Sequence, residues 1–290
     1  MKKNMNDDNE EKANKHNEDQ RKARNEYNVD SEKHKNSDDV QLFAVDMQKV
    51  LLIPRMPDVK DSFFCSRLVA FIEAFASMKN DAHFCVLWNE AIRSRNASDV
   101  TSSYIGQFFS GFALYGNKPM GPKSITMKFL VGGHTFMAAD GIHGKIEQSI
   151  RRKKNIYDMR DLMEVVENCT KRTNVLEMKV SDFALHQNLL KRSTRKTSGD
   201  IIPNLHDLCG VKFKKGSFEM IYKKDFNELG TKVSFLKTLP ENHTSKVLEC
   251  ARGVSKSKLN KIQSILVSRR PLSRLSFCED FPNCDHLENL

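Results

Sequence analysis

The segment over residues 132–154 constrains the fold more than any other part of this 290-residue chain. A strand-like run over residues 124–131 ends at Gly132-Gly133, and glycine is the usual residue where a chain leaves a strand by a tight path. Apolar residues then recur at intervals of three and four, which predicts a helix with one buried face. These residues are Phe136, Ala139, Ile142, Ile146 and Ile150.

A second stripe of the same predicted helix is polar. Asp140, His143 and Glu147 lie three and four positions apart, so they share one side of a helix. An acid, an imidazole and a second acid near the end of a strand would suit a metal or catalytic site. A structural explanation stays open, because His and Asp at a helix start are often caps and polar stripes are usually solvated.

The first 39 residues are almost all charged or amide-bearing. They cannot bury enough apolar area to offset the entropy of ordering, so the composition predicts a disordered charged tail. The whole chain has 47 Lys and Arg residues against 37 Asp and Glu, a net charge of +10, although the tail itself is slightly acidic. The positive charge therefore belongs to the rest of the chain, where it permits binding to nucleic acid or an anionic surface.

The seven cysteines are scattered and include no Cys-x-x-Cys pair, which argues against a zinc ribbon. Cys278, Cys284 and His286 lie near one another, but no fourth zinc ligand stands beside them. The chain has neither a secretory signal pattern nor an apolar run of membrane-spanning length. We therefore expect reduced thiols, no membrane partner and a nuclear or cytoplasmic location without secretion. No pattern indicates an oligomeric state.

Residues 40–54 form the first strong strand signal, which Asp46 interrupts. A carboxylate in a buried strand is costly unless it is paired, hydrogen-bonded or bound to metal, and the alternative is an edge strand with Asp46 facing water. The apolar run at residues 63–78 fits helix or strand, and the run at 83–93 is more typical of a strand. Ser98 is then expected to cap a helix. Three strands followed by a helix predict an α/β domain.

The second half of the chain predicts further elements and a division into parts. We expect a helix over residues 157–167, a strand over 174–180, a β-hairpin around Lys215-Gly216 and a helix over 256–267. The expected parts are the disordered tail at 1–39, one domain over 40–188, a basic linker at 189–204 and a small α+β extension over 205–290.

Several motif blocks resemble a family of uncharacterised insect proteins that occur in many dispersed copies and look transposon-derived. The blocks are Val45-Asp-Met-Gln-Lys-Val50, Leu52-Ile-Pro-Arg-Met-Pro57, Asp99-Val-Thr101, Gly133-His-Thr-Phe-Met-Ala-Ala-Asp140, Lys153-Lys-Asn-Ile-Tyr-Asp158 and Glu164-Val-Val166. The resemblance is strongest over residues 40–180. It implies an RNase-H-like mixed sheet flanked by helices, of the integrase and DDE-transposase type.

In an RNase-H-like core, three carboxylates hold two metal ions that activate a nucleophile and stabilise the phosphate being displaced. The resemblance assigns Asp46 to the first-strand acid and Asp140 to the helix acid. It places His134 in the same motif and leaves Glu147 as a reserve acid. If activity remained, Mg²⁺ or Mn²⁺ would be the cofactor, held weakly by Asp46 and Asp140; otherwise we expect no cofactor.

The chain departs from the family at the second acid. The family carries a strand ending in Asp-Asn-Cys-Ser-Gly-Gln-Asn-Lys-Asn, whereas residues 107–116 here read Gln-Phe-Phe-Ser-Gly-Phe-Ala-Leu-Tyr-Gly. Residues 100–139 contain no Asp or Glu. A two-metal centre that lacks one carboxylate should hold metal poorly and catalyse little. The expected sheet also lacks its central strand.

Three functions stay open on this basis. The first is a catalytically inactive RNase-H-like protein that still binds DNA or RNA. The second is an active metal-dependent nuclease or strand-transfer enzyme, in which Asp99 would replace the missing acid. The third is a residual protein-interaction product without a nucleic-acid role. The cations expected to contact phosphates are Arg151, Arg152, Lys153, Lys154, Lys191, Arg192, Arg195 and Lys196.

Overall fold

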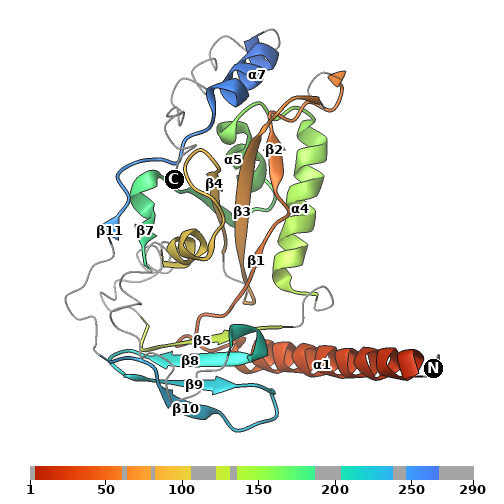
Figure 1. Cartoon of the computed structure of the whole chain (residues 1–290), viewed down its shortest axis with the longest axis vertical. Coiled ribbons are helices and arrows are strands. Elements are labelled where there is room, and N and C mark those ends of the chain that lie inside the picture. The colour runs from red at the N-terminus through yellow and green to blue at the C-terminus, as the bar shows by residue number, and fades with distance from the viewer. Residues whose placement is uncertain are drawn as a thin grey trace. The chain divides into compact units, whose positions relative to one another are not determined.

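The structure is a computed structural model, and it describes residues 4–60, 64–79, 82–105, 122–130, 136–186, 204–237 and 246–267. The chain forms two compact units, each assembled from three separate stretches (Figure 1). The first unit takes Met1–Leu42, Lys118–Phe136 and Gln187–Thr244, and the second takes Phe43–Asn117, Met137–His186 and Ser245–Leu290. These units differ from the consecutive parts expected from the sequence, because the chain passes repeatedly between them.

The second unit contains a mixed sheet. Its strands are β1 (Phe43–Met47), β2 (Leu51–Ile53), β3 (Leu68–Ser77), β4 (His83–Asn89) and β6 (Thr173–Glu177). β1 and β2 pair with β3, and β3 pairs with β4, all antiparallel, while β4 pairs with β6 in parallel. The α/β class and the mixed sheet are thereby confirmed. The expected gap at a lost central strand is not observed among the described strands, because β6 pairs directly with β4 and β1 lies at the edge.

Burial on both faces explains why the run that forms β3 was ambiguous in the sequence. Residues 70–77 of β3 are all buried, so the strand lacks the alternation of a half-exposed strand. A continuous apolar run of this kind cannot be distinguished from a buried helix by periodicity. Its antiparallel partners on both sides resolve it as a strand.

One face of this sheet carries an aromatic cluster. Its buried members are Phe71, Phe75, Phe84, Val86, Trp88, Met178 and Phe183. Trp88 is fully buried, and its indole N–H donates to the carbonyl of Ser94 over 2.8 Å. The helix over residues 97–105 contributes Tyr104, whose ring meets that of Phe75 at a centroid distance of 5.3 Å. Asn96, rather than the expected Ser98, caps this helix, since its Oδ1 accepts from the backbone N–H of Asp99.

Helices α4 (Ala138–Lys153) and α5 (Met159–Glu167) pack on the other face of the sheet (Figure 1). The apolar stripe predicted for α4 is confirmed at Ala139, Ile142, Ile146 and Ile150, which are all buried. Phe136 precedes the helix and is 78% exposed, so it does not belong to that stripe. The predicted spacing therefore identified the face that fixes α4 against the sheet.

Short elements complete the second unit. They are the 3-10 helix η1 (Val180–Asp182), the paired strands β7 (Ala184–Leu185) and β11 (Lys246–Val247), and the helix α7 (Lys256–Val267). α7 has the bounds predicted from its amphipathic spacing. Lys258 of α7 forms an ion pair with Glu90 over 2.5 Å.

The first unit contains a four-stranded antiparallel sheet in the order β10-β9-β8-β5. Its elements are β5 (Ser124–Lys128), the 3-10 helix η2 (Leu205–Asp207), β8 (Gly210–Lys214), β9 (Glu219–Lys223) and β10 (Thr231–Ser234). The predicted β8–β9 hairpin is confirmed, with Gly216 at a positive φ of 73° that favours glycine. The strand before the double glycine pairs with β8 and not with the sheet that carries Asp46.

Helix α1 (Asn4–His34) also belongs to the first unit. The composition predicted disorder here, whereas the structure describes a helix. Ion pairs attach α1 to the rest of the unit: Lys22 meets Asp225 at 2.9 Å, and Lys128 of β5 meets Glu26 at 2.6 Å and Asp30 at 2.5 Å.

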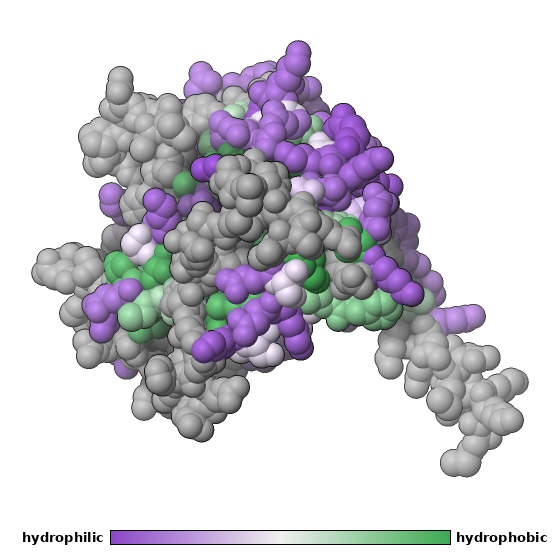
Figure 2. Space-filling view, turned by 90° about the horizontal axis from the view of Figure 1, so that it is seen from above, coloured by the Kyte–Doolittle hydropathy of each residue, from purple (hydrophilic) through white to green (hydrophobic). Residues whose placement is uncertain are grey.

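Hydrophilic residues dominate the described surface in Figure 2, and hydrophobic residues form smaller patches between them. Isolated apolar side chains are normal on a protein surface. None of the described helices combines the length and the apolar character needed to cross a membrane.

Candidate metal centre

The alternation of side chains along β1 decides where Asp46 points. Val45 and Met47 pack against the aromatic cluster, so the side chain between them is directed to the opposite face. Asp46 lies directly opposite Ala74 of β3, whose small side chain leaves the carboxylate room. The Asp46 side chain is 46% exposed. This edge position satisfies the carboxylate with solvent and directs it toward α4.

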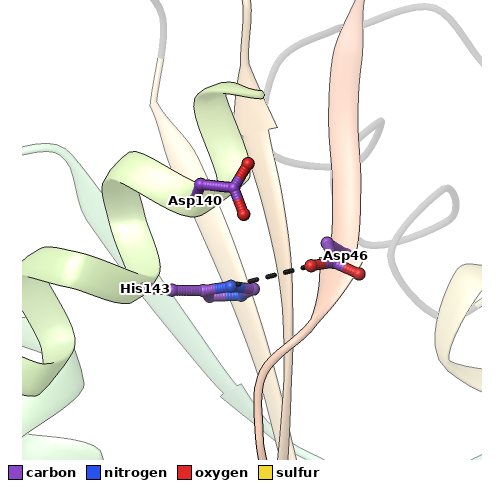
Figure 3. A group of neighbouring side chains, drawn as sticks. All are labelled: Asp46, Asp140 and His143. Carbon is purple, nitrogen blue, oxygen red and sulfur yellow. Dashed lines mark ion pairs between the residues drawn. The ribbon is translucent and has the colours of Figure 1, made fainter. Parts of the chain in front are cut away.

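Two polar residues at the start of α4 complete the cluster. Asp140 and His143 lie three positions apart, so they share one side of the helix. The buried side chains of Ile142 and Ile146 hold that side against the sheet. Figure 3 shows Asp140 and His143 extending from α4 toward Asp46 on β1.

Asp46, Asp140 and His143 each offer one ligand atom, and these atoms all lie within 4.8 Å of one another. The distance from His143 Nδ1 to Asp46 Oδ2 is 3.9 Å. Oxygen and nitrogen ligands lie about 2.0–2.6 Å from a bound divalent ion, so three donors at this spacing can share one ion after small side-chain rotations. The expected approach of Asp46 and Asp140 is therefore observed, and His143 joins them.

The environment of His143 favours the neutral imidazole. Burial lowers the pKa of His143, and the nearby carboxylates of Asp46 and Asp140 act in the opposite direction without overcoming it. A neutral imidazole has a free lone pair for a metal, whereas an imidazolium has none. The three side chains together therefore offer two carboxylates and one neutral nitrogen donor.

Asp140 also has a structural role at the start of α4. Its Oδ2 accepts a hydrogen bond from the backbone N–H of Met137 over 2.7 Å. This contact satisfies one of the unpaired N–H groups at the helix start and fixes the carboxylate. A carboxylate can accept several contacts, so this cap and a metal ion can use the same side chain.

Glu147 lies one turn further along α4 but does not belong to the cluster of three. Its Oε1 accepts a hydrogen bond from Gln48 Nε2 over 3.3 Å. Gln48 is two residues beyond Asp46 and is only 4% exposed. Gln48 Oε1 and His143 Nε2 are both buried and have no hydrogen-bond partner among the described residues. Gln48 contacts Glu147 of α4, and His143 of α4 approaches Asp46, so both side chains lie between α4 and residues 46–48.

Asp99, the suggested replacement for the missing acid, has a structural role. It is 1% exposed and forms an ion pair with Arg93 over 3.0 Å. Its second oxygen accepts a hydrogen bond from the Ser94 hydroxyl over 2.9 Å. Both oxygens are therefore occupied at the start of the helix over residues 97–105, and Asp99 is not a member of the donor cluster.

Glu73 on β3 is a buried acid that the motif analysis did not identify. It is 2% exposed and lies opposite Met47, on the face of the aromatic cluster. Burial raises its pKa to about 7, a hydrogen bond from the Ser103 hydroxyl lowers it, and the charge of Asp46 raises it. Glu73 points away from the metal face, so it does not supply the missing ligand. A lone acid in the apolar run at residues 68–76 was the available signal.

The basic residues at the end of α4 are only partly available to phosphates. Arg151, Arg152 and Lys154 are exposed. Lys153 meets Glu164 at 2.7 Å and Asp161 at 3.6 Å, so its charge is largely neutralised. The other predicted site residues, together with the C-terminal thiols and imidazole, lie outside the described residues: His134, Lys191, Arg192, Arg195, Lys196, Cys278, Cys284 and His286.

The donor set fits a divalent ion of intermediate hardness. Carboxylate oxygens suit Mg²⁺, Ca²⁺ and Mn²⁺, while an imidazole suits transition metals, so the combination favours Mn²⁺ over Mg²⁺. No third carboxylate joins the cluster among the described residues. Comparisons of the chain with protein-family models, with curated proteins and with solved structures return no match.

Proposed function

We propose that the second unit is a divalent-metal-binding domain in which Asp46, Asp140 and His143 hold one ion. The observation that carries this proposal is the approach of three metal-ligating side chains, from β1 and α4, to within 4.8 Å of one another. The neutral character of His143 supports it, because a protonated imidazole could not bind a metal.

We further propose that this centre descends from a two-metal nuclease of the RNase-H-like type and has lost efficient catalysis. An acid from the first strand and an acid from a later helix are what the family resemblance implies, and Asp46 and Asp140 occupy such places. A bound ion would supply Lewis-acid polarisation of a phosphate oxygen. Asp46 and Asp140 would hold that ion, and the imidazole of His143 would favour Mn²⁺ over Mg²⁺. The described residues provide no ligand set for a second ion.

Titration of the full chain with Mn²⁺ tests the metal site. Free Mn²⁺, measured by electron paramagnetic resonance, should fall with a stoichiometry of one ion per chain. Asp46→Asn and Asp140→Asn should each weaken binding at least tenfold, because each removes a charged ligand. Glu167→Gln removes one exposed helix acid elsewhere in the same unit and should leave binding unchanged. Equal binding by all four proteins would refute the proposed site.

A cleavage assay separates the inactive centre from an active one. We expect no Mn²⁺-dependent cleavage of end-labelled DNA or RNA above the level seen with Asp46→Asn. Cleavage that depends on both Asp46 and Asp140 would instead establish a nuclease. The exposed cations Arg151, Arg152 and Lys154 are the candidate phosphate contacts of this unit. Binding of DNA or RNA without cleavage would match a degenerate centre that has lost catalysis but still binds nucleic acid.

A further inference from the structure

The sheet of the first unit has two chemically different faces. On one face, buried Leu208, Val211 and Met220 form an apolar cluster together with partly buried Phe213 and Tyr222. Because side chains alternate along each strand, the intervening residues point to the other face. The alternate residues of β8 and β10 therefore form a second face, away from the apolar cluster.

Lysines occupy the second face on two strands. Lys212 of β8 and Lys232 of β10 both lie opposite Ile221 of β9, so the three residues form one row across the sheet. Lys214 lies two residues along β8 from Lys212 and therefore on the same face. A shallow hollow on this face is lined by Lys212, Lys214, Ser217, Glu219, Ile221 and Lys232.

Exposed hydroxyl groups extend this surface onto β5. Ser124 lies directly opposite Lys214, and Thr126 lies directly opposite Lys212. All four side chains are exposed. Together with Lys232, these four residues make up the surface that we call the lysine face: Ser124, Thr126, Lys212, Lys214 and Lys232.

The charges of the lysine face are poorly compensated. No ion pair among the described residues includes Lys212 or Lys214, and Lys232 approaches Glu219 only to 4.0 Å. Lys128 of β5, which the alternation places on the same face, is by contrast paired tightly with Glu26 at 2.6 Å and Asp30 at 2.5 Å. An exposed pair at the 4 Å limit contributes little. The face therefore keeps a local positive charge at Lys212, Lys214 and Lys232, whereas Lys22 of the same unit is paired with Asp225 at 2.9 Å.

We propose that the lysine face binds the phosphate backbone of double-stranded nucleic acid without sequence preference. Lys212 and Lys214 are about 6.8 Å apart along β8, and Lys232 lies two strand spacings, about 9.6 Å, from Lys212 across β9, so the three lysines form one array on this face. Lysine and hydroxyl side chains are typical donors to backbone phosphates. The face contains no base-reading fork and no aromatic ring for stacking single-stranded bases. Its lack of a large exposed apolar side chain disfavours membrane insertion.

The test uses the full chain and a fluorescein-labelled DNA duplex, with fluorescence anisotropy recorded over a range of salt concentrations. Measurements in EDTA remove any contribution of the metal centre, so failure of that site does not affect this test. The triple substitution Lys212→Gln, Lys214→Gln and Lys232→Gln should weaken binding roughly 10- to 100-fold near 0.1 M salt. The slope of log K against log salt should become shallower by about 2–3, since each lost phosphate contact contributes about 0.9.

A matched control substitutes three exposed lysines of the same unit outside the lysine face: Lys35→Gln, Lys224→Gln and Lys237→Gln. Both triple variants lose three positive charges, so a difference between them reports position and not net charge. The corresponding Lys→Arg triple on the lysine face should retain both binding and slope, and a circular dichroism spectrum of the Gln triple equal to that of the wild-type protein would exclude misfolding as the cause. The proposal is overturned if both Gln triples weaken binding equally, if the duplex does not bind, or if phosphatidylserine vesicles bind while the duplex does not.

Discussion

Asp46 on β1 and Glu73 on β3 are acids on adjacent strands of one sheet, and they point to opposite faces. The Asp46 side chain is 46% exposed at the edge of the described sheet, beside Asp140 and His143. Glu73 is 2% exposed among aromatic side chains, and its polar contact is the Ser103 hydroxyl. One sheet therefore holds a solvated carboxylate on one face and a desolvated carboxylate on the other.

Because Asp46 is exposed and Glu73 is buried, we expect Asp46 to affect ligand binding and Glu73 to affect stability. A carboxylate in contact with water keeps its charge at little cost, so Asp46 can hold a cation without strongly affecting folding. A carboxylate removed from water pays for its charge in folding free energy, so Glu73 links stability to pH. We expect substitutions on the aromatic face to change stability, and substitutions at the metal cluster to change binding.

The largest effect should follow substitution of the aromatic core. Trp88→Ala removes a fully buried ring and its hydrogen bond to Ser94, so we expect a loss of about 3–5 kcal/mol in the free energy of unfolding. Urea denaturation followed by circular dichroism measures this, because the substitution removes the only tryptophan of the chain. Phe136→Ala is the control, since that ring is 78% exposed and should change stability by less than about 0.5 kcal/mol. Equal losses of stability in Trp88→Ala and Phe136→Ala would contradict the assignment of Trp88 to the core.

A smaller, pH-dependent effect is expected at Glu73. Its pKa in the folded protein is about 7, above the ordinary value of 4.5, so the folded state keeps a proton that the unfolded chain releases. Stability should therefore fall as the pH rises from about 4.5 to 7 and then level off, with a total change of roughly 3 kcal/mol. Glu73→Gln removes the titrating group and can still hydrogen-bond to Ser103.

Urea denaturation at pH 5 and pH 8 tests the role of Glu73. The wild-type protein and Glu73→Gln should be similarly stable at pH 5, and the variant should be more stable at pH 8. Glu167→Gln is a suitable control, because Glu167 is an exposed acid of α5 in the same unit. A pH dependence that persists unchanged in Glu73→Gln would show that another group causes it.

Much of the local structure followed from the sequence because periodicity is a local property. The α4 stripe, the β8–β9 hairpin and the bounds of α7 were all predictable from spacing and turn residues. Local spacing does not show which strands pair with one another in a sheet. The strand before Gly132 was assigned to the same domain as Asp46, yet β5 pairs with β8 from a distant part of the chain. The separate chain stretches that make each unit were invisible for the same reason.

The candidate site was only partly predictable. Asp46 and Asp140 were paired through the family resemblance, since no spacing rule connects residues so far apart in the sequence. His143 was visible as a neighbour of Asp140 on the helix, but its contact with Asp46 depends on how α4 packs. Asp99 was equally suitable as a ligand by residue type, and its ion pair with Arg93 removed it. Packing and counter-charges thus decide which acids remain available.

An intermediate effect on stability should appear only when metal is present. Without metal, Asp46→Asn should change the free energy of unfolding by less than about 0.5 kcal/mol, because the side chain is partly exposed. At a free Mn²⁺ concentration of 100 times Kd, the wild-type protein should gain about 2.7 kcal/mol and the variant much less. Chemical denaturation with and without Mn²⁺ measures both values. If Asp46→Asn strongly lowered the free energy of unfolding without metal, Asp46 would have a role in folding stability, as Glu73 does.

The smallest effect is expected at Gln48, which is buried like Glu73 but lies close to the metal cluster like Asp46. It is 4% exposed, its amide N–H₂ donates to Glu147, and its buried Oε1 has no hydrogen-bond partner among the described residues. Gln48→Met keeps the volume and removes that unpaired oxygen, so the metal-free protein should lose little stability. A ligating histidine is normally oriented through its second nitrogen, and the buried Nε2 of His143 also has no hydrogen-bond partner among the described residues, so we expect it to pair with Gln48 Oε1 when an ion binds at Nδ1. Gln48→Met should therefore weaken Mn²⁺ binding about tenfold, a cost of about 1.4 kcal/mol. Unchanged Mn²⁺ affinity in a stable variant would confine Gln48 to packing and leave His143 oriented by α4 alone.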